Sequence, residues 1–165
     1  MNISQYYPLD VVNGPGTRCT LFVSGCIHQC RGCYNQSTQS TSAGMAFTKE
    51  HQDTIIRDLN DTRIFRRGLS LSGGDPLHPN NVADVLALIK RVKTECDNKD
   101  IWMWTGYTLA ELNEVQQEVI ALVDVLIDGK FEQDLADPSL MWRGSSNQVI
   151  HRLSDIAKAD DKTLF

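Results

Sequence analysis

The 165-residue sequence lacks any long apolar run. No stretch approaches the roughly 20 apolar residues that a membrane-spanning helix needs. Residues 1–10 also lack the basic start and the apolar centre of a secretion signal. A membrane protein and a secreted protein are therefore not expected, and we predict a cytoplasmic location.

An excess of positive charge is also missing. The chain contains 16 Lys and Arg residues against 21 Asp and Glu residues, and its formal net charge is −5. Nucleic-acid binding requires a clustered basic face, so nucleic acid is not expected as a partner. Two short basic groups, at residues 63–67 and 90–93, are most simply solvated surface. A dock for an acidic protein is the alternative interpretation.

The cysteines do not form the pattern of a disulfide framework. Their number, five, is odd, and three of them lie within eight positions, which indicates a reducing compartment. Cys19 falls in an apolar strand pattern and Cys96 lies near the end of an expected helix. Packing is the simplest role for both, and we assign neither to a functional site.

The three crowded cysteines, Cys26, Cys30 and Cys33, have the spacing C-x3-C-x2-C with no fourth cysteine close behind. Thiolates this close together can converge on one soft metal centre, and three protein ligands leave one iron of a four-iron cluster open to an outside ligand. Zinc is the alternative, with His28 or His51 as the fourth ligand, although zinc ribbons use C-x2-C pairs. A ferredoxin cluster would need another nearby cysteine.

A second motif, SGGDP at residues 72–76, follows a short apolar run. Gly73 and Gly74 allow a ligand to approach the backbone closely, and Asp75 offers acceptor oxygens to a cationic amino group. Alone, the motif is most simply a strand-to-helix turn. It gains weight from the cysteine motif that precedes it.

The apolar spacing predicts alternating strands and helices within one domain, residues 1–165, whose C-terminal end is loosely held from about residue 153. The expected strands cover residues 17–24, 68–72, 101–105 and 123–128, and the expected helices cover 48–60, 82–92 and a segment opened by a capping box at Thr108 and Glu111. We predict an α/β fold with mainly parallel strands, whose carboxyl ends carry both motifs. Trp102 and Trp104 are expected to face the helices.

Together, the C-x3-C-x2-C and SGGDP motifs resemble those of radical S-adenosylmethionine enzymes. Further runs narrow the resemblance to the activating proteins of anaerobic (class III) ribonucleoside-triphosphate reductases, over about residues 6–151. These runs are VNGPGTR at 12–18, H-x-C-x-GCYN at 28–35, TGY at 105–107 and WRGSSNQ at 142–148. The resemblance implies a shortened, open (βα) partial barrel of the radical S-adenosylmethionine type.

The resemblance also implies the cofactors and their ligands. Cys26, Cys30 and Cys33 would hold one 4Fe-4S cluster, whose fourth iron binds S-adenosylmethionine. The remaining contacts to S-adenosylmethionine are expected from two segments, namely Gly32, Cys33 and Tyr34, and Gly73, Gly74 and Asp75. The sequence does not decide whether the polar residues at the ends of the third and fourth expected strands contact the cofactor or face solvent. These residues are Thr105, Asp128 and the nearby Lys130.

The implied activity is that of an oxidoreductase acting as an activase. Reductive cleavage of S-adenosylmethionine at the cluster would yield a 5'-deoxyadenosyl radical, which abstracts hydrogen and leaves a glycyl radical on the reductase. No acid–base set is required, because hydrogen abstraction depends on positioning. The expected partners are the reductase, in a stable complex, and reduced flavodoxin or a similar electron donor.

Two departures from the family pattern and two rival functions remain open. Asp75 stands where relatives often have glutamate, and the aromatic Tyr34 follows the last cysteine instead of preceding it. One rival is another small radical S-adenosylmethionine protein, either the activase of a different glycyl-radical enzyme or one that acts on a small molecule. The other is a binding module in which the cysteines hold zinc for folding.

Overall fold

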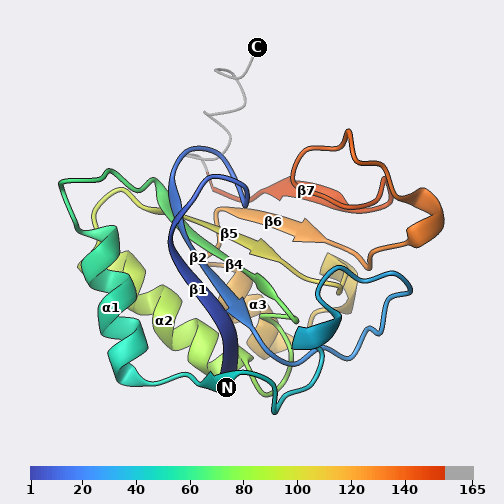
Figure 1. Ribbon diagram of the computed structural model, residues 1–165, viewed down its shortest axis with the longest axis horizontal. Helices are drawn as coiled ribbons and strands as arrows, with labels where there is room; N and C mark the ends of the chain where they lie inside the picture. Colours follow the sequence, from blue (N-terminus) through green and yellow to red (C-terminus); the bar gives the residue numbers. More distant parts are fainter. Residues whose placement is uncertain (155–165) are drawn as a thin grey trace.

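The computed structural model describes residues 1–154, and its centre is one seven-stranded sheet (Figure 1). The strand order is β3-β1-β2-β4-β5-β6-β7. The strands are β1 (Asn2–Asp10), β2 (Arg18–Val23), β3 (Met45–Ala46), β4 (Gly68–Gly73), β5 (Asp100–Trp104), β6 (Val125–Asp128) and β7 (Val149–Arg152). The helices are α1 (Lys49–Leu59), α2 (Val82–Glu95) and α3 (Glu114–Ile120), with short 3-10 turns at Gln36–Thr38, Leu109–Glu111 and Gln133–Leu135.

The four central strands, β2, β4, β5 and β6, are parallel to one another. They are the four strands that the sequence predicts, and the α/β class is confirmed. Because β2 and β4 pair in register from their first residues to Val23 opposite Gly73, they end at the same edge of the sheet. The cysteine loop and the SGGDP segment therefore begin side by side, although they lie about fifty residues apart in the chain.

One face of the sheet packs on the helices. In each central strand, alternate residues point toward this face, as a pleated strand requires. Leu21, Leu71 and Met103 are fully buried there, in one cluster with Val85 and Ile89 of α2. A continuous apolar layer thus joins the helices to the sheet and fixes the positions of the strand ends.

The opposite face carries a second, smaller core, and here one prediction is wrong. Trp102 is 2% exposed and packs with Val125 and Ile127, while Trp104 and Trp142 lie against this group. The tryptophans therefore face away from the helices. Alternation along β5 correctly separates them from Ile101 and Met103, but it does not reveal which set meets the helices.

A buried ion pair closes this second face at the start of the strands. The guanidinium group of Arg18 is fully buried and lies 2.6 Å from Asp100 Oδ1. It also donates to Ser70 Oγ at 2.7 Å and stands over the ring of Trp102. A Cβ on Gly14 would lie 3.0 Å from the Arg18 side chain, so the loop before β2 covers the pair closely.

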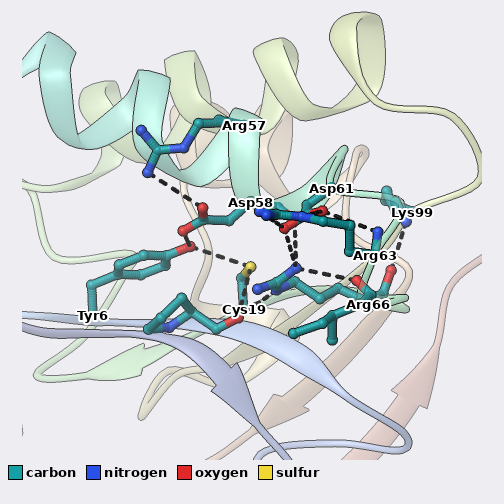
Figure 2. Close-up of polar contacts among 10 residues, drawn as sticks. Tyr6, Cys19, Arg57, Asp58, Asp61, Arg63, Arg66 and Lys99 are labelled. Carbon is teal, nitrogen blue, oxygen red and sulfur yellow. Dashed lines mark hydrogen bonds and ion pairs between the residues drawn. The ribbon is translucent and has the colours of Figure 1, made fainter.

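On the helix-covered face, a polar network connects β1 and β2 to the end of α1 (Figure 2). The hydroxyl of Tyr6 lies 2.9 Å from Asp58 Oδ2 and 3.3 Å from Cys19 Sγ. Burial raises the pKa of the Cys19 thiol to about 11. Cys96 is also buried, at 6% exposure. Both cysteines therefore pack in the interior, as the sequence predicts.

The basic groups at residues 63–67 and 90–93 are largely engaged within the fold. Arg66 is 5% exposed and donates to the carbonyl groups of Pro8, Asp58 and Ile64. Arg63 pairs with Asp61, as Figure 2 shows, and Arg67 pairs with Asp100. In the second group, Arg91 pairs with Glu95, and Lys93 pairs with Asp124. The first group lies at the start of β4, at the opposite end of that strand from the SGGDP segment.

The sequence-based description misses three strands and displaces one helix. Residues 2–10 form strand β1 between β3 and β2, and β3 and β7 are the edge strands of a sheet of seven strands instead of about four. The capping box at Thr108 opens only a 3-10 turn, and α3 begins later, capped by Asn113. Leu153 donates to the carbonyl of Asp124, and the rest of the C-terminal end expected to be loose lies outside the described residues. No helix within residues 1–154 is long and apolar enough to span a membrane.

We expect Arg18→Ala to lower the free energy of unfolding by about 3–5 kcal/mol, because it removes the buried partner of Asp100 and leaves only the partly exposed Arg67. Urea unfolding followed by circular dichroism measures the change. Arg63→Ala is the control, since this side chain is 87% exposed in its pair with Asp61, and it should cost less than about 1 kcal/mol. Equal losses in the two variants would contradict this account.

Candidate metal centre

The three crowded cysteines line one cleft of about 500 Å³ at the carboxyl ends of the parallel strands. Cys26, Cys30 and Cys33 are half-buried free thiols. The floor of the cleft continues the second face of the sheet, because Phe22, Ser72 and Trp104 also line it. The cleft is also lined by Gly73, Gly74, Thr105, Tyr34 and Phe131. The structure therefore brings both sequence motifs to the same cavity.

Backbone conformation directs the cysteine loop into the cleft. Gly25 has φ +104° and Gly32 has φ +72°, values that favour glycine. The amide of Cys26 donates to the carbonyl of Gln39 at 2.9 Å, and the amide of Cys33 donates to the carbonyl of Cys30 at 3.2 Å. The first bond anchors the loop to the chain that follows it. The second closes a tight turn between Cys30 and Cys33.

The two glycines of the SGGDP segment pack directly against the cysteine loop. Gly73 has φ +108°, and a Cβ at this position would lie 2.5 Å from the carbonyl oxygen of Val23. A Cβ on Gly74 would lie 2.5 Å from the carbonyl oxygen of Gly25. Side chains are therefore excluded at both positions by the neighbouring backbone. Gly73 and Gly74, here called the glycine edge, also line the cleft, where they present backbone atoms alone.

Asp75 points away from the cleft into the protein. It is 1% exposed and is not among the residues that line the cavity. Its carboxylate accepts hydrogen bonds from the Leu77 and Gly106 amides at 2.8 and 3.0 Å, and from the Thr105 hydroxyl at 2.9 Å. His28 Nε2 lies 2.7 Å from its second oxygen. This carboxylate is saturated by protein donors.

Tyr34 and Gly32, the expected neighbours of an adenine ring, lie differently. Tyr34 lines the cleft, is 89% exposed and meets the edge of the Phe131 ring at a centroid distance of 6.0 Å. It is therefore not a packed core aromatic. Gly32 does not line the cleft; a Cβ on it would lie 2.9 Å from the side chain of Gln133. Contact between cofactor and either residue stays a prediction.

The three polar residues whose role the sequence leaves open lie in two different pockets. Thr105 lines the cleft, although its hydroxyl is bonded to Asp75. Asp128 and Lys130 line a neighbouring pocket of about 590 Å³. Asp128 accepts from the amide of Leu109 at 2.9 Å, and His151 Nε2 lies 3.0 Å from its other oxygen. Asp128 is thus occupied in holding local structure.

The donor set suits a soft metal centre. Three thiols share one cavity that is large enough for a group beyond a single ion. Burial raises the pKa of the Cys26 thiol, so a metal has to displace its proton on binding. The two histidines that the zinc alternative would use as a fourth ligand both have protein partners. His51 caps α1 through Thr48, and His28 is bonded to Asp75. The ligand atoms of Cys26, His28 and Asp75 nevertheless lie within 4.8 Å of one another.

Sequence reasoning did not identify the aromatic walls of the cleft. Phe22 and Trp104 lie on its floor, while Phe131 and Trp142 come from the chain beyond β6. The motif that contains Asn35 likewise does not reveal that its side chain donates to the carbonyl of Gly73, at 3.1 Å. Alternation along β2 and β5 places Phe22 and Trp104 on one face of the sheet, and this was the available signal.

Comparison with known proteins gives a consistent result. Residues 12–151 match the model of a family described as a 4Fe-4S single cluster domain. Proteins named anaerobic ribonucleoside-triphosphate reductase-activating protein are similar to the chain. The relative from Vibrio cholerae is 70% identical over 154 residues, which cover 93% of this chain and 99% of the relative. The relative from Escherichia coli K12 is 67% identical, with 93% and 99% covered. The relative from bacteriophage T4 is 45% identical, with 94% and 96% covered.

We expect Cys30→Ala to lose bound iron, because only two of the three converging thiols remain. Anaerobically purified protein should contain about four irons and four sulfides per chain, and the variant much less. Iron and acid-labile sulfide assays measure both quantities. Cys96→Ala is the matched control, since Cys96 lies outside the cleft, and it should retain the full content. Bound zinc in place of iron in the unaltered protein would contradict the assignment.

Proposed function

The chain belongs to the family of anaerobic ribonucleoside-triphosphate reductase-activating proteins, and on this premise we propose that it generates a glycyl radical on such a reductase. The observation that carries the proposal is the convergence of three free thiols and an open glycine edge on one cleft. Three thiolates provide for a cluster with one open iron. The glycine edge provides the space that a second ligand on that iron needs.

In this proposal, Cys26, Cys30 and Cys33 hold a 4Fe-4S cluster, and S-adenosylmethionine occupies the adjoining part of the cleft. The chemistry that these two groups supply when bound is one-electron cleavage of the sulfonium, which yields methionine and a 5'-deoxyadenosyl radical able to take hydrogen from a glycine α-carbon. The protein has to orient the groups and exclude competing reactions. The aromatic walls of the cleft serve the second purpose by reducing access of water.

The residues of the chain divide into contacting and supporting groups. We assign the methionine moiety to the backbone of Gly73 and Gly74, which line the cleft without side chains. We assign the adenine ring to Cys33 and Tyr34, with the Gly32 turn shaping this segment. Asp75 supports the glycine edge from behind, because its carboxylate is fully bonded within the protein.

The mouth of the cleft fits a protein substrate. Val12 is 73% exposed and Tyr34 is 89% exposed, and both line the cleft. Exposed apolar groups around a cavity are typical of a surface that another protein covers. We therefore place the reductase over this opening. An electron donor such as flavodoxin also has to reach the cysteine loop, and the basic group at residues 63–67 is not favoured as its dock because it lies at the far end of β4.

We further propose that the sheet is a shortened form of the open radical S-adenosylmethionine barrel, with the protein acting in the cytoplasm. The four parallel strands would be the barrel portion. The antiparallel strands β1 and β7 flank that portion on its two sides, and the cleft lies on the face opposite the helices.

The proposed function predicts that the cluster-loaded, reduced protein releases 5'-deoxyadenosine from S-adenosylmethionine. With the anaerobic reductase present, the same samples should show a glycyl radical by electron paramagnetic resonance (EPR). Both signals should disappear in Cys33→Ala. Nucleoside release without a glycyl radical would retain the cleavage chemistry but reject the reductase as substrate. Absence of both signals in protein with a full cluster would reject the activase function.

The adenine assignment predicts a selective effect of Tyr34→Ala. Stacking of a base on an aromatic ring contributes about 1–3 kcal/mol, so the dissociation constant for S-adenosylmethionine should rise roughly tenfold. Equilibrium binding to the cluster-loaded protein measures this change. Tyr34→Phe keeps the ring and should bind as the unaltered protein does. Unchanged binding by Tyr34→Ala would show that adenine lies elsewhere.

A further inference from the structure

A buried histidine lies within the cysteine loop, between its first two cysteines. The His28 side chain is 4% exposed, and its Nε2 lies 2.7 Å from Asp75 Oδ2. Asp75 follows the glycine edge immediately. His28 therefore links the loop that carries the thiols to the segment that carries the glycines.

The other hydrogen-bond partners of Asp75 determine which group donates in the bond between His28 and Asp75. Its other partners within residues 1–154 are the amides of Leu77 and Gly106 and the hydroxyl of Thr105, which all donate. An ionised carboxylate only accepts, so His28 Nε2 carries a proton and donates to it. The carboxylate thereby joins three segments, namely the cysteine loop, the chain after β4 and the chain after β5.

The imidazole ring is also held from the side. A Cβ on Gly106 would lie 2.3 Å from His28 Cδ2, so the backbone of Gly106 passes directly against the ring. The ring of Tyr107 meets it edge-on, with centroids 4.6 Å apart and planes at 81°. The ring is therefore fixed in orientation as well as in hydrogen bonding, and a side chain at position 106 would displace it.

Within residues 1–154, the other bonds that link the loop to the SGGDP segment are made at the two ends of the loop. Asn81 Nδ2 donates to the carbonyls of Ser24 and Asp75, both at 2.9 Å, which secures the start of the loop. Asn35 donates to the carbonyl of Gly73 beyond the last cysteine. Among residues 1–154, His28 is the only one between Cys26 and Cys33 whose side chain is bonded to the SGGDP segment.

We propose that His28 is a positioning residue that fixes the cysteine loop against the glycine edge, and so determines how the cluster and S-adenosylmethionine meet. The inference rests on the proposed function. His28 lines the cleft, but its proposed role does not require contact with either group. It acts through Asp75, whose backbone continues from Gly74, and through the chain that connects it to Cys26 and Cys30.

If His28 has this role, its replacement should affect S-adenosylmethionine binding but not cluster binding. Without the imidazole, the three thiols remain and should still hold four irons. The glycine edge, however, loses its link to the loop. Outer residues that orient metal sites change affinity or activity by on the order of tenfold or more, and we expect a rise of this size in the dissociation constant for S-adenosylmethionine. The change in the EPR spectrum of the reduced cluster on adding S-adenosylmethionine should become correspondingly smaller.

The experiment compares His28→Ala, His28→Asn and His28→Gln as cluster-loaded proteins. A glutamine amide nitrogen can take the position of Nε2 and donate to Asp75, whereas an asparagine amide is too short to do so. Iron content, S-adenosylmethionine binding and the EPR spectrum with and without S-adenosylmethionine are measured for each. His51→Gln is the control at a remote histidine, since glutamine preserves the capping of α1.

The proposal expects full iron content in all variants, weaker binding and a reduced spectral change in His28→Ala and His28→Asn, and recovery in His28→Gln. Binding and spectra equal to those of the unaltered protein in all three variants would overturn it. Loss of iron from the alanine and asparagine variants would also overturn it, because the requirement would then lie in holding the cluster. Failure of the unaltered protein to bind S-adenosylmethionine would instead reject the proposed function.

Discussion

The site depends on one close backbone contact, between the end of β2 and the end of β4. The parallel pairing of these strands runs to Val23 and Gly73, and the chain then turns away on both sides without space for a side chain at Gly73 or Gly74. The amide of Asp75 donates to the carbonyl of Gly25, which extends the contact beyond the strands. A sequence that lost either glycine would have to separate the two loops. The cleft would then lose one of its two walls.

The two faces of the sheet carry out different tasks. The helix-covered face is largely apolar in the central strands and provides most of the core. The other face changes character along its length, from the buried Arg18 and Asp100 pair, through the Trp102 group, to the half-buried thiols. The alternation of side chains in β4, with leucines on one side and serines on the other, allows a single strand to serve both faces.

The sequence predicted the parts of the fold and site that depend on local pattern. The four central strands are short apolar runs, and the cysteine spacing indicates convergence by itself. Strand β1 was missed because register shifts interrupt its alternation between Ile3 and Gln5 and again between Tyr7 and Asp10. The partners of Asp75 were missed because His28 and Thr105 lie 47 and 30 positions away in the chain. No short-range pattern shows which loops meet at the end of a sheet.

The closed end of the second face limits how a protein segment can approach the thiols. Among the described residues, Arg18, Ser70 and Trp102 fill the second face at the start of the strands, where all three are buried beneath the loop that precedes β2. Under the proposed function, a protein segment would instead enter from the exposed side of the cleft, where Val12 and Tyr34 lie. It would have to leave by that side as well, so departure of the partner would be a separate physical event from the reaction.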